Sequence, residues 1–422
     1  MLGYFIDAPV PGAQFDVHTL RILGWALAID GPVAAVETLY HGRVVQRTSA
    51  DARRSDVAAR YSDIEEAENC GFSSLVSTLG FTEKFQLSIQ AVHSDGTTTQ
   101  LATLHCTRGP LDIDFEPKLQ PLILTSMGRT GTTWLMQLMG QHPEIVASRT
   151  YPHEDSVAKY LFHALRVVAA PSSPHLSSSA DDFHGNLEFV GHNPYYDDGL
   201  AALPELGYWL GRRFPERLAA HLVEEVDDWY AMLARRYRQP SVRFFAEKHV
   251  PGHLPVLMRS IYVGAREVFL VRDFRDVACS ALAFNKKRGF DAFGAKAGQT
   301  MEQFLESLRL SAFALYRSWK ARGDSSHLVR YEDLVLSPGS TLIALLEYLG
   351  ADASPEMVAG LLSSGAAQAG LLAEHRTSES LEASVGRWRR DSDDAFARLM
   401  DSALGSVLDL FEYDRSPIAS AD

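Results

Sequence analysis

The sequence has few cysteines and no long apolar run. Its three cysteines, Cys70, Cys106 and Cys279, are too widely spaced for a disulfide framework or a zinc site, which predicts reduced, buried thiols. No apolar run approaches the roughly 18 residues that a membrane helix needs, and the first residues lack the basic and apolar segments of a signal peptide. We therefore expect a cytoplasmic protein without a membrane span.

Positive charge is also in deficit. The 422 residues carry 40 Lys and Arg against 53 Asp and Glu, a formal net charge of -13. This balance argues against a broad basic face for nucleic acid or for an anionic membrane, because such surfaces need excess positive charge. A local basic pocket is still compatible with it. We expect no nucleic-acid partner.

Residues 1–110 have the pattern of a small antiparallel β-sandwich. Short segments rich in Val, Ile, Leu and Thr are separated by the turn signals "DGP", "HGR" and "SDG". The interrupting segment "RRSDVAARYSDIEEAENCGF" predicts a loop with a short helix. It resembles a loop of the β-sandwich modules appended to bacterial glycosyltransferases and related enzymes, a resemblance that implies no chemistry.

The pattern changes after a linker that contains Pro110 and Pro117. Short apolar runs at 121–126, 267–271 and 327–331 predict strands, and the first two are uniformly apolar, as strands buried on both faces are. They alternate with helical patterns such as 301–320. The sequence therefore predicts an α/β fold over residues 118–415, with a P-loop-type parallel sheet flanked by helices, preceded by the all-β sandwich.

The segment "SMGRTGTTWLMQLM" (126–139) joins the first of these strands to a helix. Backbone N–H groups in such a turn, together with the helix dipole, form an anion site. Gly128 and Gly131 allow close approach, Thr132 and Thr133 supply hydroxyls, and Arg129 supplies a forked cation. A kinase-type P-loop has a lysine after its last glycine, and Thr132 stands there instead. The alternatives are a phosphate-binding loop and a plain turn.

A second candidate anion site follows the strand "EVFLV". Arg272 stands at the carboxyl end of this strand and Ser280 lies eight residues later. Ligands of open α/β sheets bind outside these strand ends, so Arg272 is placed for a second anion. The alternative is that Arg272 and the neighbouring Asp273, Arg275 and Asp276 form surface ion pairs.

Four motifs together resemble one enzyme family. "GRTGTTWL", "FLVRDFRDVACSALAF", "VRYEDLVLSPGSTLIALLEYLG" and "SVGRWRRDS" occur in that order between Pro121 and Ser392. They are similar to the motifs of the sulfotransferases, of bacterial type, that use 3′-phosphoadenosine 5′-phosphosulfate (PAPS). The resemblance implies transfer of a sulfuryl group from PAPS to a hydroxyl acceptor.

The resemblance also assigns residues to the donor. It implies that Arg129 touches the 5′-phosphate and the bridging oxygen, and that Arg272 and Ser280 hold the 3′-phosphate. Further residues that it places around the nucleotide are Thr130, Gly131, Thr132, Thr133, Trp134, Tyr331 and Arg387, with Arg389 as an additional candidate.

Two residues are candidates for the base that an alcohol acceptor needs. His249, followed by Val250 and Pro251, resembles the catalytic histidine of cytosolic small-molecule sulfotransferases. Glu154 lies downstream of the loop, roughly where carbohydrate and protein-tyrosine sulfotransferases keep a glutamate. Lys248 is a candidate to stabilise the transferring group. The sequence leaves the choice of base open, and it contains no convincing metal-ligand pattern, so we expect no metal.

Two rival functions stay open. One is a P-loop metabolite kinase, which the missing lysine disfavours, and the other is a non-catalytic nucleotide- or glycan-binding protein. The acceptor is expected to be a carbohydrate, a glycoconjugate or a small metabolite, bound by a variable segment (150–215) that includes Tyr195 and Tyr196. The sequence does not address the oligomeric state.

Overall fold

The computed structural model describes residues 1–29, 31–171, 204–289, 298–367 and 377–415. The chain forms two compact units, Met1–Glu116 with Tyr160–Glu224 and Pro117–Lys159 with Glu225–Asp422. The boundaries expected from sequence, 1–110 and 118–415, stay a prediction; residues 160–224 group with the N-terminal unit. Among the described residues, no helix combines the length and apolar character needed to cross a membrane.

The N-terminal unit contains the predicted β-sandwich. One sheet has the strand order β1-β3-β7-β6 and the other β2-β9-β8-β4-β5. Buried residues of both sheets, such as Ile22 and Leu87, share one core. The strands are β1 (Gly3–Ala8), β2 (Gln14–Phe15), β3 (Thr19–Leu27), β4 (Val33–Tyr40), β5 (Arg43–Thr48), β6 (Ala52–Arg53), β7 (Asn69–Ser77), β8 (Lys84–His93) and β9 (Thr98–Arg108).

Tight turns that contain glycine join two pairs of neighbouring strands. Gly42 and Gly96 have positive φ in the turns that join β4 to β5 and β8 to β9, where a left-handed residue is needed and glycine adopts it freely. The segment between β6 and β7 contains the short helix α1 (Ser55–Arg60) and the 3₁₀ turn η1 (Glu65–Glu68). The prediction of a loop with a short helix is confirmed. The unit also contains α5 (Pro204–Tyr208), η2 (Trp209–Arg213) and the first part of α6 (Phe214–Tyr237).

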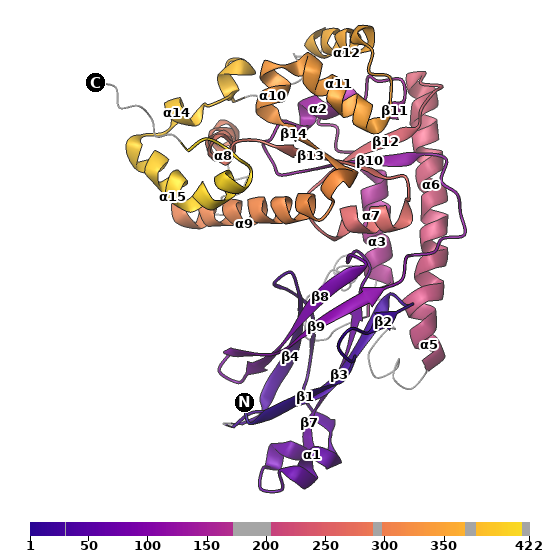
Figure 1. Cartoon of the computed structure of the whole chain (residues 1–422), viewed down its shortest axis with the longest axis vertical. Coiled ribbons are helices and arrows are strands. Elements are labelled where there is room, and N and C mark those ends of the chain that lie inside the picture. Colours follow the sequence, from indigo (N-terminus) through magenta and orange to yellow (C-terminus); the bar gives the residue numbers. More distant parts are fainter. Residues whose placement is uncertain (30, 172–203, 290–297, 368–376, 416–422) are drawn as a thin grey trace. The chain divides into compact units, whose positions relative to one another are not determined.

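The second unit is built on a parallel sheet of five strands. Their order is β11-β12-β10-β13-β14, and every neighbouring pair is parallel. The strands are β10 (Gln120–Ser126), β11 (Ile145–Val146), β12 (Phe244–His249), β13 (Arg266–Val271) and β14 (Ser326–Arg330). β10 and β13 lie side by side at the centre of the sheet (Figure 1), so the two segments that follow them emerge at the same edge.

Helices cover both faces of this sheet (Figure 1). Along β13, Val268 and Leu270 pack on one face against α2, α11 and α12, while Phe269 and Val271 pack on the other against α8, α9 and α15. The helices of this unit include α2 (Thr132–Met139), α7 (His253–Ile261), α8 (Phe274–Arg288), α9 (Met301–Lys320), α10 (Tyr331–Leu336), α11 (Pro338–Leu349), α12 (Pro355–Ala367), α14 (Trp388–Asp391) and α15 (Asp394–Leu410), with the 3₁₀ turns η3 (Gly323–Ser325) and η4 (Glu382–Ser384). The helix α3 (Val157–Val168) begins in this unit, and its residues from Tyr160 on belong to the N-terminal unit.

Local signals explain where several helices begin and end. Asp273 caps α8 by accepting from the Arg275 N–H, and Thr300 with Gln303 forms a capping box on α9. Gly350 ends α11 in the left-handed conformation. The predicted fold class is confirmed: a parallel sheet flanked by helices, preceded by a β-sandwich. The strands β11 and β12 were not among the three predicted strands.

Candidate functional site

The loop between β10 and α2 (residues 127–131, the β10–α2 loop) has a left-handed backbone at two positions. Arg129 has φ 68° and Gly131 has φ 94°. A Cβ atom on Gly131 would lie 2.5 Å from two carbons of the Tyr331 ring. Glycine is therefore required at this position both for the backbone conformation and for the space.

Thr130 points away from the pocket that this loop borders. Its side chain is buried, and its hydroxyl lies 2.9 Å from the carbonyl oxygen of Met127 and 2.6 Å from the Ser126 hydroxyl. The Thr130 side chain therefore braces the loop from inside. Among the ten predicted donor-binding residues, Thr130 alone does not line the pocket.

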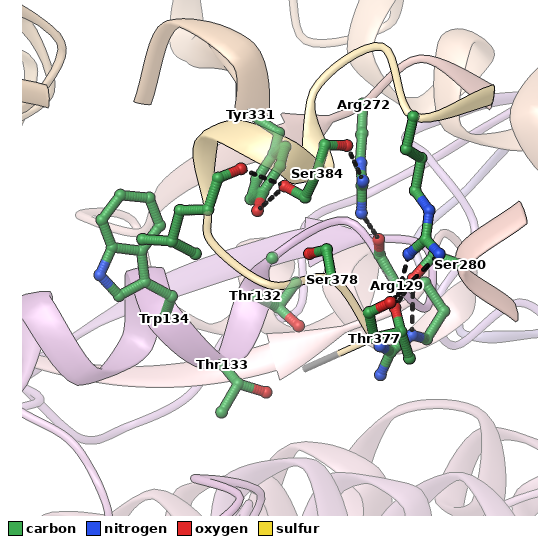
Figure 2. Close-up of a pocket in the computed structure, with 13 residues that line it drawn as sticks. Arg129, Thr132, Thr133, Trp134, Arg272, Ser280, Tyr331, Thr377, Ser378 and Ser384 are labelled. Carbon is green, nitrogen blue, oxygen red and sulfur yellow. Dashed lines mark hydrogen bonds between the residues drawn. The ribbon is translucent and has the colours of Figure 1, made fainter. Parts of the chain in front are cut away.

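The other nine predicted donor-binding residues line a single pocket (Figure 2). They come from three separate parts of the second unit: the loop and helix after β10, the ends of β13 and β14 with the helices after them, and the segment of residues 377–388, called here the late segment. The pocket-lining residues are Arg129, Gly131, Thr132, Thr133, Trp134, Arg272, Ser280, Tyr331, Thr377, Ser378, Leu381, Ser384 and Arg387.

Arg129 carries its charge into this pocket. Its guanidinium lies 4.3 Å from the centre of the Phe284 ring, and its Nε donates to Ser280 Oγ over 3.3 Å. Burial, and after it the charges of Arg272 and Arg387, together lower the pKa of Arg129 to about 10. Since like charges repel, a pocket that gathers three cations favours a bound anion.

Arg272 and Arg387 also line this pocket. Arg272 donates to the carbonyl oxygens of Arg129 (3.0 Å) and Ser384 (2.5 Å). Its Nε is buried and makes no hydrogen bond to the described residues. Arg387 donates to the Thr377 hydroxyl over 2.6 Å and pairs with Asp391. The alternative of surface ion pairs does not hold for Arg272, which is only 4% exposed.

Sequence reasoning assigned no role to four pocket-lining residues, Thr377, Ser378, Leu381 and Ser384. They belong to the run "TSESLEAS", which is rich in hydroxyl groups and whose last residue, Ser384, is the first residue of the motif "SVGRWRRDS". Its hydroxyl content was the available signal. A buried carboxylate holds this segment, because Asp276 accepts from the backbone N–H groups of Gly386 (2.7 Å) and Trp388 (2.9 Å).

A second polar cluster lies at the end of β12. Lys248 Nζ is 3.0 Å from the hydroxyl of the pocket residue Thr133 and 3.3 Å from Glu154 Oε1. It also donates to the carbonyl oxygen of Pro152 over 2.7 Å. Burial lowers the pKa of Lys248, and Glu154 opposes this shift. Glu154 itself is 59% exposed in its side chain, so solvent reaches it.

His249 lies on the opposite face of β12. Because side chains alternate along a strand, Lys248 points toward α2 while His249 shares its face with Glu247. The His249 side chain is 1% exposed, and its Nε2 lies 3.6 Å from Glu247 Oε2. Glu247 in turn accepts from the Tyr230 hydroxyl over 2.6 Å. The structure therefore brings Glu154 and Lys248 together with the pocket through Thr133, and it does not bring His249 there.

Two other expectations concern the acceptor and metals. Tyr195 and Tyr196, named as acceptor candidates, lie outside the described residues. Arg389, the additional candidate, lies 4.6 Å over the Trp388 ring and does not line the pocket. Within the described ranges, no group of three or more His, Cys, Asp or Glu side chains is arranged to hold a metal ion. Metal independence stays a prediction.

Comparison with known proteins adds to these observations. No curated protein sequence matches this chain significantly. Among solved structures, a sulfotransferase domain from the curacin biosynthetic pathway has 13% identity and a TM-score of 0.39, with 70% of this chain and 99% of that chain covered. Sulfotransferase STF9 from Mycobacterium avium has 17% identity and a TM-score of 0.33, with 71% and 78% covered. Mouse sulfotransferase SULT7A1, solved in complex with PAP, has 15% identity and a TM-score of 0.38, with 71% and 91% covered.

These TM-scores are too low to support an argument, and the family match does not depend on them. Residues 121–355, more than half of the 422 residues, match the sequence profile described as the sulfotransferase family. The matched range includes β10 with its loop, β13 with Arg272 and Ser280, and β14 with Tyr331. The chain belongs to the sulfotransferase family.

Proposed function

We propose that this protein transfers a sulfuryl group from PAPS to a hydroxyl of an acceptor molecule. The observation that carries the proposal is the meeting of Arg129, Arg272 and Arg387 in one pocket. PAPS has phosphate groups at two ends of one adenosine, so its recognition needs cations in two places within one cavity. Guanidinium groups suit this task because each can bind two oxygens at once.

We assign the residues of the pocket to the two ends of this donor. The β10–α2 loop and Arg129 would hold the 5′-phosphosulfate, at the amino end of α2 where the helix dipole favours an anion. Arg272, Ser280 and Arg387, which all line the pocket, would hold the 3′-phosphate. The donor supplies an activated sulfuryl group with a phosphate as the leaving group.

For the acceptor, the geometry favours Glu154 over His249 as the base. Glu154 is exposed and lies 3.3 Å from Lys248 Nζ, which in turn contacts the pocket residue Thr133. In this role Glu154 would take the hydroxyl proton of the acceptor, and Lys248 would stabilise negative charge on the sulfuryl oxygens. His249 is enclosed on the other face of β12 and is suited to a structural role.

The proposed carboxylate base and the N-terminal β-sandwich both bear on the class of acceptor. A carboxylate base can accept the proton of an alcohol hydroxyl. Carbohydrates, glycoconjugates and small metabolites can all supply such a hydroxyl. The N-terminal β-sandwich resembles the modules appended to bacterial glycosyltransferases, an association at the level of the fold that is compatible with a sugar acceptor. A cytoplasmic location stays a prediction.

Two measurements on the full chain test the proposal. Isothermal titration with 3′,5′-diphosphoadenosine (PAP) and with ATP is expected to give tighter binding of PAP. Incubation with radiolabelled PAPS and a metabolite extract, followed by mass spectrometry, is expected to yield sulfated products. Tighter binding of ATP would favour the metabolite kinase, and PAP binding without transfer to any acceptor would favour a non-catalytic binding protein.

A further inference from the structure

Arg272 contacts both sides of the pocket through backbone carbonyl groups. Its Nη1 donates to Arg129 O over 3.0 Å and its Nη2 donates to Ser384 O over 2.5 Å. Figure 2 shows Arg272 between these two residues, with a dashed line to each. A single guanidinium therefore links the β10–α2 loop to the late segment.

The carbonyl group that accepts from Arg272 belongs to a residue in an unfavourable conformation. Arg129 has φ 68°, in the left-handed region that costs a non-glycine residue free energy. Such a conformation persists where surrounding contacts hold it. A hydrogen bond from a buried charged donor is among the stronger contacts available for this purpose.

Arg272 is itself held in place by the same groups. Its guanidinium lies 4.6 Å from the centre of the Tyr331 ring, and the Tyr331 hydroxyl lies 2.8 Å from Ser384 Oγ. The same ring occupies the space above Gly131, where a Cβ would meet it at 2.5 Å. Arg272, Tyr331 and Ser384 thus form one packed group against the β10–α2 loop.

We propose that Arg272 positions the β10–α2 loop, and through it the 5′-phosphosulfate, in addition to contacting the 3′-phosphate. Arg272 is then a positioning residue for one end of the donor and a binding residue for the other, and it couples the two phosphate sites. The naming of the ligand rests on the proposed function. The positioning of the loop rests on the contacts alone.

A donor analogue that has only one of the two phosphate ends distinguishes the two roles of Arg272. Adenosine 5′-phosphosulfate carries the phosphosulfate group but no 3′-phosphate. If Arg272 served the 3′-phosphate alone, its replacement would leave binding of this analogue unchanged. If Arg272 also positions the loop, the analogue loses affinity as well.

The experiment uses the full chain with Arg272→Lys, Arg272→Gln and the control Lys286→Gln, which removes a charge from an exposed position of α8, the helix that follows Arg272. Lysine keeps the charge but lacks the planar fork that reaches two carbonyl groups. Isothermal titration with adenosine 5′-phosphosulfate is expected to show about a tenfold loss of affinity for both Arg272 variants, and with PAP a larger loss. The control is expected to match the unchanged protein. Should Arg272→Gln fail to fold, Arg272→Lys decides.

Hydrogen exchange in the ligand-free protein gives a readout independent of any nucleotide. Arg272→Lys is expected to speed exchange in residues 126–134 and 381–388 while the strands β13 and β14 keep their protection. Unchanged exchange in the loop together with unchanged affinity for adenosine 5′-phosphosulfate would overturn the proposal. If the unchanged protein binds neither nucleotide, the proposed function fails, and the exchange measurement still decides whether Arg272 positions the loop.

Discussion

At the scale of single residues, the alternation of side chains along β12 distinguishes the two candidate bases. His249 is one candidate, and its neighbour Lys248 contacts the other, Glu154. Lys248 and His249 are neighbours in the chain, yet they point to opposite faces of the sheet. Lys248 contacts Thr133 and Glu154, whereas His249 lies beside Glu247 with 1% of its side chain exposed. The motif alone did not reveal the face, since it did not identify β12 as a strand.

Replacement of the two candidate bases, Glu154 and His249, is expected to have unequal effects on turnover. Glu154→Gln should lower kcat by about 10²–10⁴, the usual contribution of a general base, while PAP affinity stays within about twofold. His249→Asn should keep most of the turnover. Steady-state kinetics and isothermal titration on both variants check this. Loss of turnover in His249→Asn with normal turnover in Glu154→Gln would reverse the assignment.

The residue-scale predictions from sequence depended on position relative to strand ends. Arg129 and Arg272 follow buried strands, and a parallel sheet brings such positions to one edge, so their meeting in one pocket was predictable. Thr377 and Ser384 follow no strand and reach the pocket through tertiary packing of the late segment. Only the hydroxyl content of the segment pointed to them, and it did not predict that they line the pocket. Contact of any of these residues with the donor stays a prediction.

At the scale of elements, the junction of the β10–α2 loop with α10 depends on one glycine. Gly131→Ala places a methyl group where the Tyr331 ring lies and forces alanine into φ 94°. We expect a loss of about 1–3 kcal/mol in the free energy of unfolding and at least a tenfold loss of PAP affinity. Urea unfolding and isothermal titration measure both.

A matched control for this substitution is Gly360→Ala. Gly360 lies within α12, and nothing is found within 4 Å of a Cβ added there. Because alanine favours helix over glycine by up to about 1 kcal/mol, this variant should be as stable as the unchanged protein or slightly more so. Equal behaviour of the two variants would contradict the special role of Gly131.

The attachment of the late segment to α8 predicts a pH dependence of stability. Burial raises the pKa of Asp276 to about 6, and the positive charge of Arg272 and the N–H groups of Gly386 and Trp388 only partly offset this effect, while Asp273 adds to it. Since the folded pKa lies above the unfolded value, the contribution of Asp276 to stability is present below about pH 4 and is lost as pH rises to about 6.

Asp276→Asn removes this titration. The free energy of unfolding of the unchanged protein minus that of the variant should fall by on the order of 2–3 kcal/mol between about pH 4 and pH 6, and it should stay level above pH 6. Urea unfolding across this pH range measures the difference. A difference that stays constant would show that Asp276 has an ordinary pKa, and one that rises with pH would show that folding lowers this pKa; either result would contradict the prediction.

Local signals in the sequence were sufficient for most of the elements. The runs at 121–126, 267–271 and 327–331 match β10, β13 and β14 within a residue or two, and the helix expected at 301–320 is α9. The two-residue strand β11 is too short to give a pattern. β12 contains the charged residues Glu247 and Lys248, which interrupt its apolar run. The periodicity of apolar residues therefore did not identify this strand.

At the scale of the whole molecule, the excess of acidic residues and the arginine pocket together predict which anions bind. A net charge of -13 repels extended polyanions, while the three arginines of the pocket attract a small one. We expect no change in the fluorescence anisotropy of labelled double-stranded DNA at about 150 mM salt, at protein concentrations that bind PAP. Salt-dependent DNA binding would contradict this expectation.

The sequence also predicted the two kinds of architecture in the chain. Turn signals and alternating patterns are local, so they indicated the β-sandwich and the parallel sheet. The grouping of residues 160–224 with the N-terminal unit depends on contacts between segments far apart in the sequence. No local pattern encodes such contacts.

The central claim is that one nucleotide with two phosphate ends occupies the pocket lined by Arg129 and Arg272. A crystal structure of the full chain with PAP tests it most directly. We predict the 5′-phosphate at Arg129 and the β10–α2 loop, with the 3′-phosphate at Arg272, Ser280 and Arg387. Nucleotide bound elsewhere, or a 3′-phosphate that contacts none of these three residues, would contradict the account.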